Sequence, residues 1–305
     1  MRQLPPGLVF TADAAAQYGW TRSALRHGVR TGRVLRMGPG VFCAPEAADV
    51  RAIAVAAALR HADGVLSHRT AALMRDTPVV GGRPDLAEMT FAPGAGANRA
   101  GVHVHRAHLP PTDIDPMSGV PVTSAARTVV DIARNRPLVT GVAAMDDVLH
   151  RELADEKDIL RVLHECANWT GARRAKLAWS LVDARSESAL ESASRLRLRE
   201  LGVCAPELQK SIFDTRGRFV TRVDFYWDEY GVYGEADGRT KYVDRATLWL
   251  EKQREDELGR LGLVAARWGW DEAWHRPRLI RERVLSAFGR GRARDRSGFP
   301  RKWSL

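Results

Sequence analysis

The sequence predicts an α+β protein of several domains, and three observations support this fold class. Two short helix patterns and a glycine-rich hairpin signal follow one another in residues 1–45. Alanine-rich helical runs alternate with short β patterns in the middle of the chain. The last third shows the order helix, three strands, helix, strand. We expect a winged helix-turn-helix at 1–45, an α/β middle domain at 46–150, a helical linker at 151–184, an αβββαβ domain at 185–275 and a basic, disordered tail at 276–305.

Composition is typical of a globular protein that contacts a polyanion. The 305 residues are 45% hydrophobic, and no run approaches the roughly 18 apolar residues of a membrane span. The net charge is +10; residues 1–45 carry +5 and residues 276–305 carry +8, so the remainder carries −3. Positive charge concentrated in two segments indicates contact with nucleic acid. The three cysteines fit no zinc spacing and the first residues lack the apolar core of a secretion signal, so we expect a cytoplasmic protein with reduced thiols.

The first segment predicts two short helices followed by a hairpin. Phe10 to Gly19 has a helix pattern with Thr11 as N-cap, and a second helix opens at Trp20-Thr21 and ends at Gly32. Gly38-Pro39-Gly40 separates two short apolar runs, which is a hairpin signal. Helix, tight turn, basic helix and basic hairpin predict a winged helix-turn-helix whose second helix enters the major groove of DNA. The alternative is a small helical cap with a solvated arginine face. The predicted DNA contacts are Thr21, Arg22, Arg26, Arg30, Arg33 and Arg36.

The middle of the chain has three polar patterns, for which we expect plain structural roles. His103 and His105 share one face of a predicted strand, but no third zinc ligand is spaced usefully. Ser67-His68 stands at a helix start with Ser67 as N-cap, and because adjacent side chains on a helix point apart, we do not expect a nucleophile pair. Arg127 and Asp131 are four residues apart on a helix, and we expect a surface ion pair.

The most informative chemistry lies in two carboxylate-bearing strands. Residues 219–227 and 232–237 both alternate as strands, and a turn at 228–231 would place Asp224 directly opposite Glu235. Like charges about 5 Å apart repel each other, and a bound cation removes that repulsion. Oxygen ligands suit Mg²⁺ or Mn²⁺. The alternative is that these carboxylates are exposed strand residues or ion-pair partners.

Several short motifs in the first 150 residues belong together. They are Ala14-Ala15, Gly19-Trp20-Thr21-Arg22, Leu25, Gly32-Arg33-Val34, Gly38-Pro39-Gly40-Val41-Phe42, Ser67-His68-Arg69 and residues 121–128. With these motifs the chain resembles the AbiEi family of type IV toxin–antitoxin antitoxins, from the N-terminal winged helix to about residue 150. The resemblance implies binding to double-stranded DNA, repression of the protein's own operon and a nucleotidyltransferase toxin as partner.

A second group of motifs lies in the C-terminal third. They are Glu191-Ser192 with Arg195, Arg222-Val223-Asp224-Phe225, Glu235-Ala236-Asp237-Gly238 with Lys241-Tyr242, and residues 254–258 leading to Arg267. In the order αβββαβ, these motifs resemble the restriction-endonuclease-like PD-(D/E)xK nucleases. Over residues 185–272 the closer resemblance is to the very-short-patch-repair-like endonuclease domain. It implies a metal-dependent hydrolysis of phosphodiester bonds.

The nuclease resemblance assigns roles to individual residues. Asp224 and Glu235 would hold Mg²⁺ or Mn²⁺, which neutralises the transition state and activates a water, and Glu191 would complete or orient the site. The family has a lysine two residues after the second acid, and this chain has Asp237 there. Lys241 would then supply the positive charge, or Asp237 would be a further ligand, so the departure puts turnover in doubt. Phosphates would be held by Lys252 and Arg254.

Two hypotheses of different classes follow. The first is a metal-dependent DNA endonuclease that a winged helix directs to its target. The second is an AbiEi-like antitoxin or transcriptional repressor whose nuclease-like domain is inactive and serves as a scaffold. A third possibility, a structural protein that binds nucleic acid nonspecifically through its two basic segments, would lose all binding in high salt.

Overall fold

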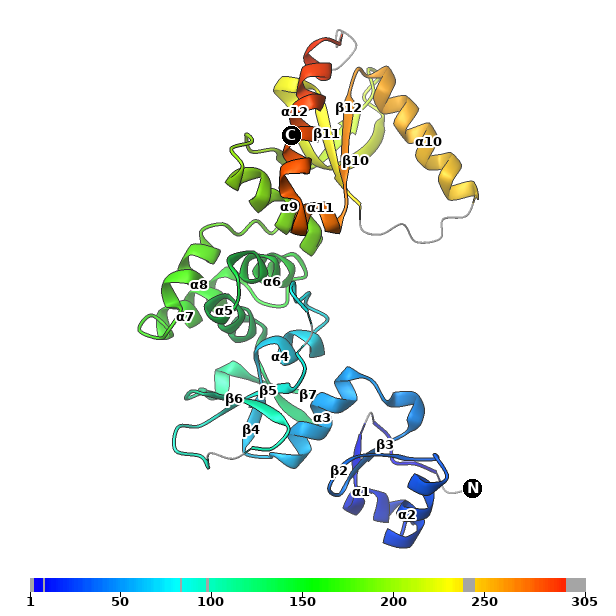
Figure 1. The fold of residues 1–305 in the computed structure, drawn as a ribbon, viewed down its shortest axis with the longest axis vertical. Helices are drawn as coiled ribbons and strands as arrows, with labels where there is room; N and C mark the ends of the chain where they lie inside the picture. Colours follow the sequence, from blue (N-terminus) through cyan, green and yellow to red (C-terminus); the bar gives the residue numbers. More distant parts are fainter. Residues whose placement is uncertain (1–2, 8, 83, 97–98, 238–244, 295–305) are drawn as a thin grey trace. The chain divides into compact units, whose positions relative to one another are not determined.

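A computed structural model describes residues 3–7, 9–82, 84–96, 99–237 and 245–294. The chain divides into two compact units, Met1–Ser180 and Leu181–Leu305, which we call the N-terminal and C-terminal units. The described residues form twelve α-helices and three β-sheets (Figure 1). The predicted mixture of helices and sheets is therefore confirmed.

The N-terminal unit begins with two helices and a hairpin at the predicted positions. Thr11 and Thr21 precede the two helices, and each hydroxyl accepts a backbone N–H three residues ahead, at 3.1 Å. Gly32 ends the second helix region with φ +71°, a left-handed conformation that glycine adopts without strain. The strands form a sheet of order β1-β3-β2. The elements are β1 (Phe10–Thr11), α1 (Ala12–Gln17), α2 (Arg22–Arg30), β2 (Leu35–Gly38) and β3 (Val41–Cys43).

A five-stranded sheet of order β6-β5-β4-β8-β7 follows in the same unit. The alanine-rich α3 packs closely on this sheet because its side chains are small, and five of its alanines are buried. Gly64 leaves room for the ring of Phe91, since a Cβ at position 64 would lie 2.5 Å from that ring. The elements are α3 (Val50–Arg60), β4 (Gly64–Leu66), α4 (His68–Met74), β5 (Ala87–Phe91), β6 (Val102–Arg106), β7 (Ile114–Met117) and β8 (Val120–Thr123).

Four helices complete the N-terminal unit, including the segment that the sequence predicts to be a linker. They are α5 (Ala125–Asn135), α6 (Leu138–His150), α7 (Glu156–Glu165) and α8 (Ala172–Trp179). Gly171, just before α8, has φ +83°, and a Cβ there would lie only 2.2 Å from the carbonyl oxygen of Arg134. The guanidinium of Arg134 also donates two hydrogen bonds to the carbonyl oxygen of Thr170. Residues 169–179 are thus packed against α5.

The C-terminal unit is built on a four-stranded sheet of order β12-β11-β10-β9. The element order helix, three strands, helix, strand agrees with the prediction. One face of the sheet packs on α9, α11 and α12 around Phe225 and Trp268, and the other packs on α10 around Tyr233 and Leu258 (Figure 1). The elements are α9 (Ala189–Glu200), β9 (Glu207–Phe213), β10 (Phe219–Trp227), β11 (Val232–Ala236), α10 (Arg245–Arg260), β12 (Val264–Trp268), α11 (Trp270–His275) and α12 (Pro277–Arg292).

The prediction of a disordered tail from residue 276 is wrong for most of that segment. Residues 277–292 form α12, and the side chains of Ile280, Val284 and Phe288 are buried in the core of the C-terminal unit. Gly291 packs so closely that a Cβ would lie 2.1 Å from the carbonyl oxygen of Tyr230. Residues 295–305 lie outside the described part of the chain.

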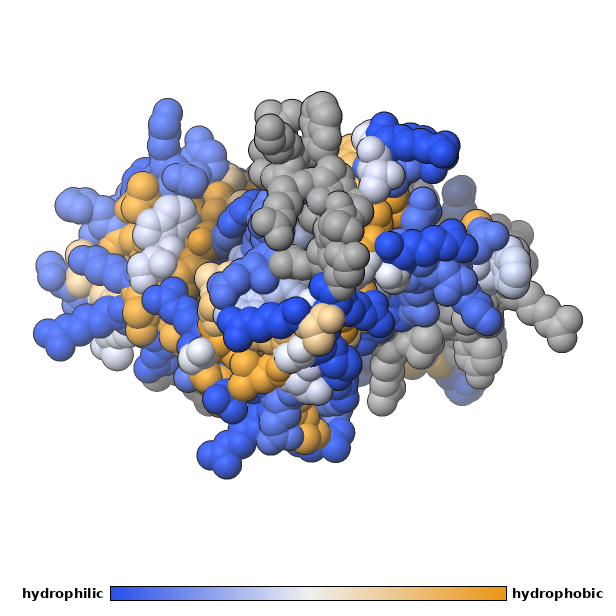
Figure 2. Space-filling model, turned by 90° about the horizontal axis from the view of Figure 1, so that it is seen from above, coloured by the Kyte–Doolittle hydropathy of each residue, from blue (hydrophilic) through white to orange (hydrophobic). Residues whose placement is uncertain are grey.

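The surface and the helices are consistent with the composition. Hydrophilic side chains cover much of the face seen in Figure 2, with smaller hydrophobic patches between them. Among the described residues, no helix combines the length and apolar character that a membrane crossing requires.

Candidate functional site

The arginines of α2 form one exposed basic surface on the N-terminal unit. Arg22, Arg26 and Arg30 recur every four residues, which places them on one side of the helix, and all three are exposed. We call these three residues the arginine stripe. The opposite side of α2 carries Leu25 and Gly28, which are buried. A Cβ at Gly28 would lie 2.7 Å from Val34, so this glycine allows α2 to approach the hairpin closely.

Two more arginines extend the basic surface beyond α2. The guanidinium of Arg33 lies 5.6 Å from the ring centroid of the buried Trp20, and Arg36 donates a hydrogen bond to the carbonyl oxygen of Gly38 at 3.3 Å. No carboxylate of the described residues lies within ion-pair distance of the arginine stripe, Arg33 or Arg36. Asp13 is the single acid among residues 1–45. The surface therefore keeps its positive charge available to an anionic ligand.

In the C-terminal unit, the predicted carboxylate hairpin is present. Residues Asp228–Tyr230 form a short 3₁₀ turn, and the pairing of Phe225 with Gly234 sets a register that places Asp224 opposite Glu235. Asp224 accepts the backbone N–H of Ala236 at 2.8 Å. Burial raises the pKa of Asp224 to about 6, and it raises the pKa of Glu235 to about 7 although Arg254 opposes this shift.

Glu191 is linked to Asp224 through the side-chain amide of Gln209. The side-chain nitrogen of Gln209 donates to Glu191 Oε2 at 2.8 Å and lies 3.4 Å from Asp224 Oδ1. Glu191 also accepts the backbone N–H of Glu187 and the hydroxyl of Ser188. We call Glu191, Asp224 and Glu235 the carboxylate cluster. Sequence reasoning missed Gln209, because its contact with this cluster depends on the pairing of β9 with β10.

Gln209 itself has an unusual backbone. Its φ is +52°, a left-handed conformation that is rare for a residue inside a strand. Leu208 packs with Phe225 on one face of the sheet, whereas Ile212 packs with Tyr226 on the other, although residues an even number apart normally share a face. The left-handed Gln209 lies at the point where this change of face occurs. The paired strand β10 changes face at the same level, between Val223 and Phe225.

The predicted cationic residues around the carboxylate cluster differ in their surroundings. Arg254, expected to hold phosphate, instead donates to Glu235 Oε1 at 3.0 Å and to Glu251 at 2.7 Å. Lys252 is exposed on the same helix. Asp237 is exposed, and its backbone N–H donates to the carbonyl oxygen of Trp268. Lys241 lies outside the described residues.

The carboxylate cluster offers the hard oxygen atoms that Mg²⁺ or Mn²⁺ prefers, but protein donors already occupy several of them. Both Glu191 oxygens accept hydrogen bonds, and Glu235 Oε1 is paired with Arg254. In the described part of the chain, no group of three or more His, Cys, Asp or Glu side chains is arranged to hold a metal ion. That Asp224 and Glu235 hold a divalent cation stays a prediction.

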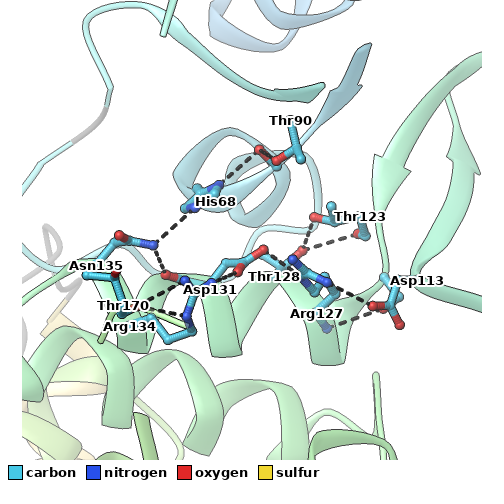
Figure 3. Close-up of polar contacts among 12 residues, drawn as sticks. His68, Thr90, Asp113, Thr123, Arg127, Thr128, Asp131, Arg134, Asn135 and Thr170 are labelled. Atoms are coloured by element: carbon cyan, nitrogen blue, oxygen red, sulfur yellow. Dashed lines mark hydrogen bonds and ion pairs between the residues drawn. The ribbon is translucent and has the colours of Figure 1, made fainter. Parts of the chain in front are cut away.

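A buried polar network in the N-terminal unit corrects a second prediction. Arg127 and Asp131 form the expected pair at 2.8 Å, but both are 1% exposed, so the pair is in the core and not on the surface. Arg127 also binds the buried Asp113 at 3.2 Å (Figure 3). Its guanidinium lies 4.6 Å from the ring centroid of Trp169. Arg134 binds Asp131 at 2.7 Å. This network ties α5 to the segment before β7 and to the segment before α8.

The expectation that Ser67 and His68 point apart is also wrong. His68 has φ +51°, and its Nδ1 lies 2.9 Å from Ser67 Oγ, while Asn135 contacts Nε2 at 3.2 Å. Thr90 donates to Ser67 Oγ, and the His105 ring stacks on His68 with centroids 3.4 Å apart. Burial and the neighbouring His105 lower the pKa of His68 well below its ordinary value. Both Ser67 and His68 are buried, which favours a structural role for the pair.

Comparisons with known proteins agree with the organisation of the N-terminal unit. Residues 6–45 match the family described as "Transcriptional regulator, AbiEi antitoxin", and residues 44–184 match the "AbiEi antitoxin C-terminal domain". Residues 6–184 are therefore AbiEi antitoxin family domains. The predicted resemblance is confirmed for these domains, and the match continues past residue 150 through α7 and α8.

Similar proteins occur in Mycobacterium tuberculosis. "Uncharacterized protein MT2308" of strain CDC 1551 and "Uncharacterized protein Rv2248" of strain H37Rv are each 26% identical to this chain over 284 residues, covering 89% of it and 98% of their own length. Among solved structures, the crystal structure of the RV2827C protein from the same organism is similar with a TM-score of 0.40 and 19% identity. That likeness covers 59% of this chain and 78% of the other.

Proposed function

We propose that this AbiEi-type protein is a DNA-binding transcriptional regulator that contacts duplex DNA through a winged helix-turn-helix at its N-terminus. The observation that carries the proposal is the arginine stripe on α2, three exposed guanidinium groups with no carboxylate partner in the described part of the chain. Exposed arginines of this kind bind phosphate oxygens and, in the major groove, guanine edges. The family match to a transcriptional regulator over residues 6–45 supports it.

The arrangement also explains why α2, and not α1, would enter the major groove. Six-residue α1 carries the acid Asp13, whereas nine-residue α2 carries three exposed arginines. Arg33 and Arg36 of the hairpin would contact the flanking phosphates, as the wing does in this type of fold. The cap residue Thr21 lies at the N-terminus of α2, where a free backbone N–H favours a phosphate. As in other AbiEi-type systems, we propose a nucleotidyltransferase toxin as the partner.

The test is equilibrium binding of the full-length protein to duplex DNA from upstream of its own gene. We expect Arg26→Ala to weaken binding about tenfold, equivalent to about 1.4 kcal/mol. We also expect it to reduce the slope of log affinity against log salt by about 1. Arg173→Ala is the matched control, because Arg173 is exposed on α8 and removes the same charge. An equal loss in both variants would show that only net charge matters and would reject the α2 contact.

A second candidate function for the C-terminal unit is metal-dependent hydrolysis of DNA. The specific observation is that Asp224 and Glu235 lie opposite each other on paired strands and that burial raises both pKa values. When bound, Mg²⁺ would supply charge neutralisation and an activated water. Asp224 and Glu235 would hold it, Glu191 would orient Asp224 through Gln209, and Asp237 and Lys241 keep their predicted roles as a further ligand and a source of positive charge. Under this candidate the unit is an endonuclease-like αβββαβ domain.

Nicking of supercoiled and mismatched duplex DNA in Mg²⁺ and in Mn²⁺ tests this candidate. Cleavage by the wild type that is lost in Asp224→Ala supports the candidate, provided that the Asp224→Ala variant keeps its Arg26-dependent DNA binding. Absence of cleavage by the wild type in both ions, with normal DNA affinity, would leave the regulator as the function. In that case Glu235→Ala should have no effect on repression.

A further inference from the structure

A pocket of about 590 Å³ lies along β9, the edge strand of the sheet in the C-terminal unit. It is lined by Glu207, Gln209, Lys210, Ser211, Phe213 and Arg216, together with Gly217 of the turn that follows β9. Its volume falls in the range of about 300–1,000 Å³ that is usual for sites of small ligands. The pocket is remote in sequence from α2 and belongs to a different unit.

The chemistry of the pocket combines an aromatic wall with an available cation. The Phe213 ring lies 5.9 Å from the ring of Phe219, which is 61% exposed at the start of β10. Arg216 is exposed, and no carboxylate of the described residues lies within ion-pair distance of its guanidinium. Lys210 also lines the pocket, with its ammonium group paired to Glu207 at 2.8 Å.

Polar atoms for a ligand that is both flat and polar are present on the same strand. The side-chain nitrogen of Gln209 faces Glu191 and Asp224, because the amide nitrogen is the donor and an ionised carboxylate can only accept. Its Oε1 accepts no hydrogen bond from the described residues and can accept one from a ligand. Ser211 lines the same pocket, and a serine hydroxyl can donate or accept a hydrogen bond. The aromatic face fits a base, and the hydrogen-bonding groups fit the edge of that base. The free guanidinium fits the phosphate of the same nucleotide.

We propose that the β9 pocket binds a single nucleotide, either free or as an unpaired residue of a DNA strand, with its base against Phe213 and its phosphate on Arg216. The site goes beyond duplex binding by α2, because it requires a base that is not stacked in a duplex. Gln209 lines this pocket and also contacts Glu191 and Asp224 of the carboxylate cluster.

The test uses the full-length protein and a fluorescein-labelled single-stranded (dT)₁₂, which has no major groove for α2. We expect Phe213→Leu, which keeps an apolar side chain but removes the aromatic face, to weaken binding about tenfold, within the range measured for stacked bases. Arg216→Ala should weaken it to a similar extent. Arg260→Ala is the matched control on the exposed side of α10 and should change affinity less than twofold.

Two comparisons decide the result. Wild-type affinity in Phe213→Leu, or an equal loss in Arg260→Ala and Arg216→Ala, would overturn the proposal, because binding would then depend on charge alone. If thymidine 5′-monophosphate competes with (dT)₁₂, the pocket is a site for free nucleotides. If (dT)₁₂ binding depends on Phe213 but the monophosphate does not compete, the pocket is a site for a DNA strand. Duplex binding that is lost in Arg26→Ala but intact in Phe213→Leu separates this site from the proposed function of α2.

Discussion

The raised pKa of Asp224 leads to a quantitative prediction about stability. Burial raises this pKa from 3.8 to about 6, so the folded C-terminal unit holds a proton on Asp224 more tightly than the unfolded chain does. Above pH 6 the group is ionised in both states, and the folded state carries the cost of a buried charge. A tenfold change in an ionisation constant corresponds to about 1.4 kcal/mol, so the cost is about 3 kcal/mol.

The substitution Asp224→Asn removes this cost while it keeps the shape of the side chain. Asparagine can still accept the backbone N–H of Ala236 through its amide oxygen. We expect the variant to be about 2–3 kcal/mol more stable than the wild type at pH 8. The sign follows from proton binding: between about pH 4 and pH 6 the folded wild type binds more protons than the unfolded chain, so its stability falls as the pH rises through this window. In the variant that slope should be smaller.

Urea unfolding of the full-length protein at pH 4.5 and pH 8 measures both effects in the transition of the C-terminal unit. The loss of the Asp224 charge also removes one of the interactions that raise the pKa of Glu235, which adds to the stabilisation at high pH. Asp256→Asn, at an exposed position of α10, is the control and should change stability by less than about 0.5 kcal/mol. A variant that is less stable than the wild type at pH 8 would refute the reasoning. It would show that the ionised carboxylate is stabilised where it lies.

Two further substitutions test the packing of each unit by thermal or urea unfolding. Arg127→Met should destabilise the N-terminal unit by about 3–5 kcal/mol, because it leaves two buried aspartates short of a partner, whereas Arg151→Ala at a half-exposed ion pair should cost less than about 1 kcal/mol. An equal effect of both changes would contradict the buried network. Gly291→Ala should destabilise the C-terminal unit by about 1–3 kcal/mol, because the new Cβ meets the Tyr230 carbonyl, while Gly289→Ala has open space and should be neutral or stabilising. Equal stability of the two alanine variants would show that α12 is not packed as described.

The elements near the N-terminus were predictable because their signals are local. Thr11 and Thr21 cap helices through atoms three residues away, and Gly32 supplies a positive φ at the end of α2. The carboxylate hairpin was predictable for a similar reason, since a short turn fixes its register. α12 was missed although its signal was present. Its buried apolar residues stand at positions 280, 284, 287 and 288, a helical spacing that the many arginines concealed.

The contacts that the sequence did not reveal join residues distant along the chain. Arg127 pairs with Asp113, which is 14 residues away, and stacks on Trp169, which is 42 residues away. A spacing of four residues predicts that Arg127 and Asp131 meet but contains no information about burial, because burial depends on what else packs on α5. The position of Gln209 between two carboxylates likewise depends on strand pairing and on one left-handed residue.

The structure also separates the two basic segments, which the net charge alone makes equivalent. In the described part of the C-terminal segment, three arginines pair with carboxylates: Arg276 with Asp271, Arg283 with Glu272 and Arg292 with Glu229. Four further exposed arginines have no carboxylate partner among the described residues: Arg278, Arg281, Arg290 and Arg294. The arginine stripe of α2 has no such partner in the described part of the chain. An arginine that already holds a carboxylate must give up that pair to bind a phosphate, whereas a solvated arginine releases only water and counterions. Part of the charge of the C-terminal segment is thus neutralised within its own unit, whereas none of the arginine stripe is, so we expect the strongest salt dependence of binding to map to α2.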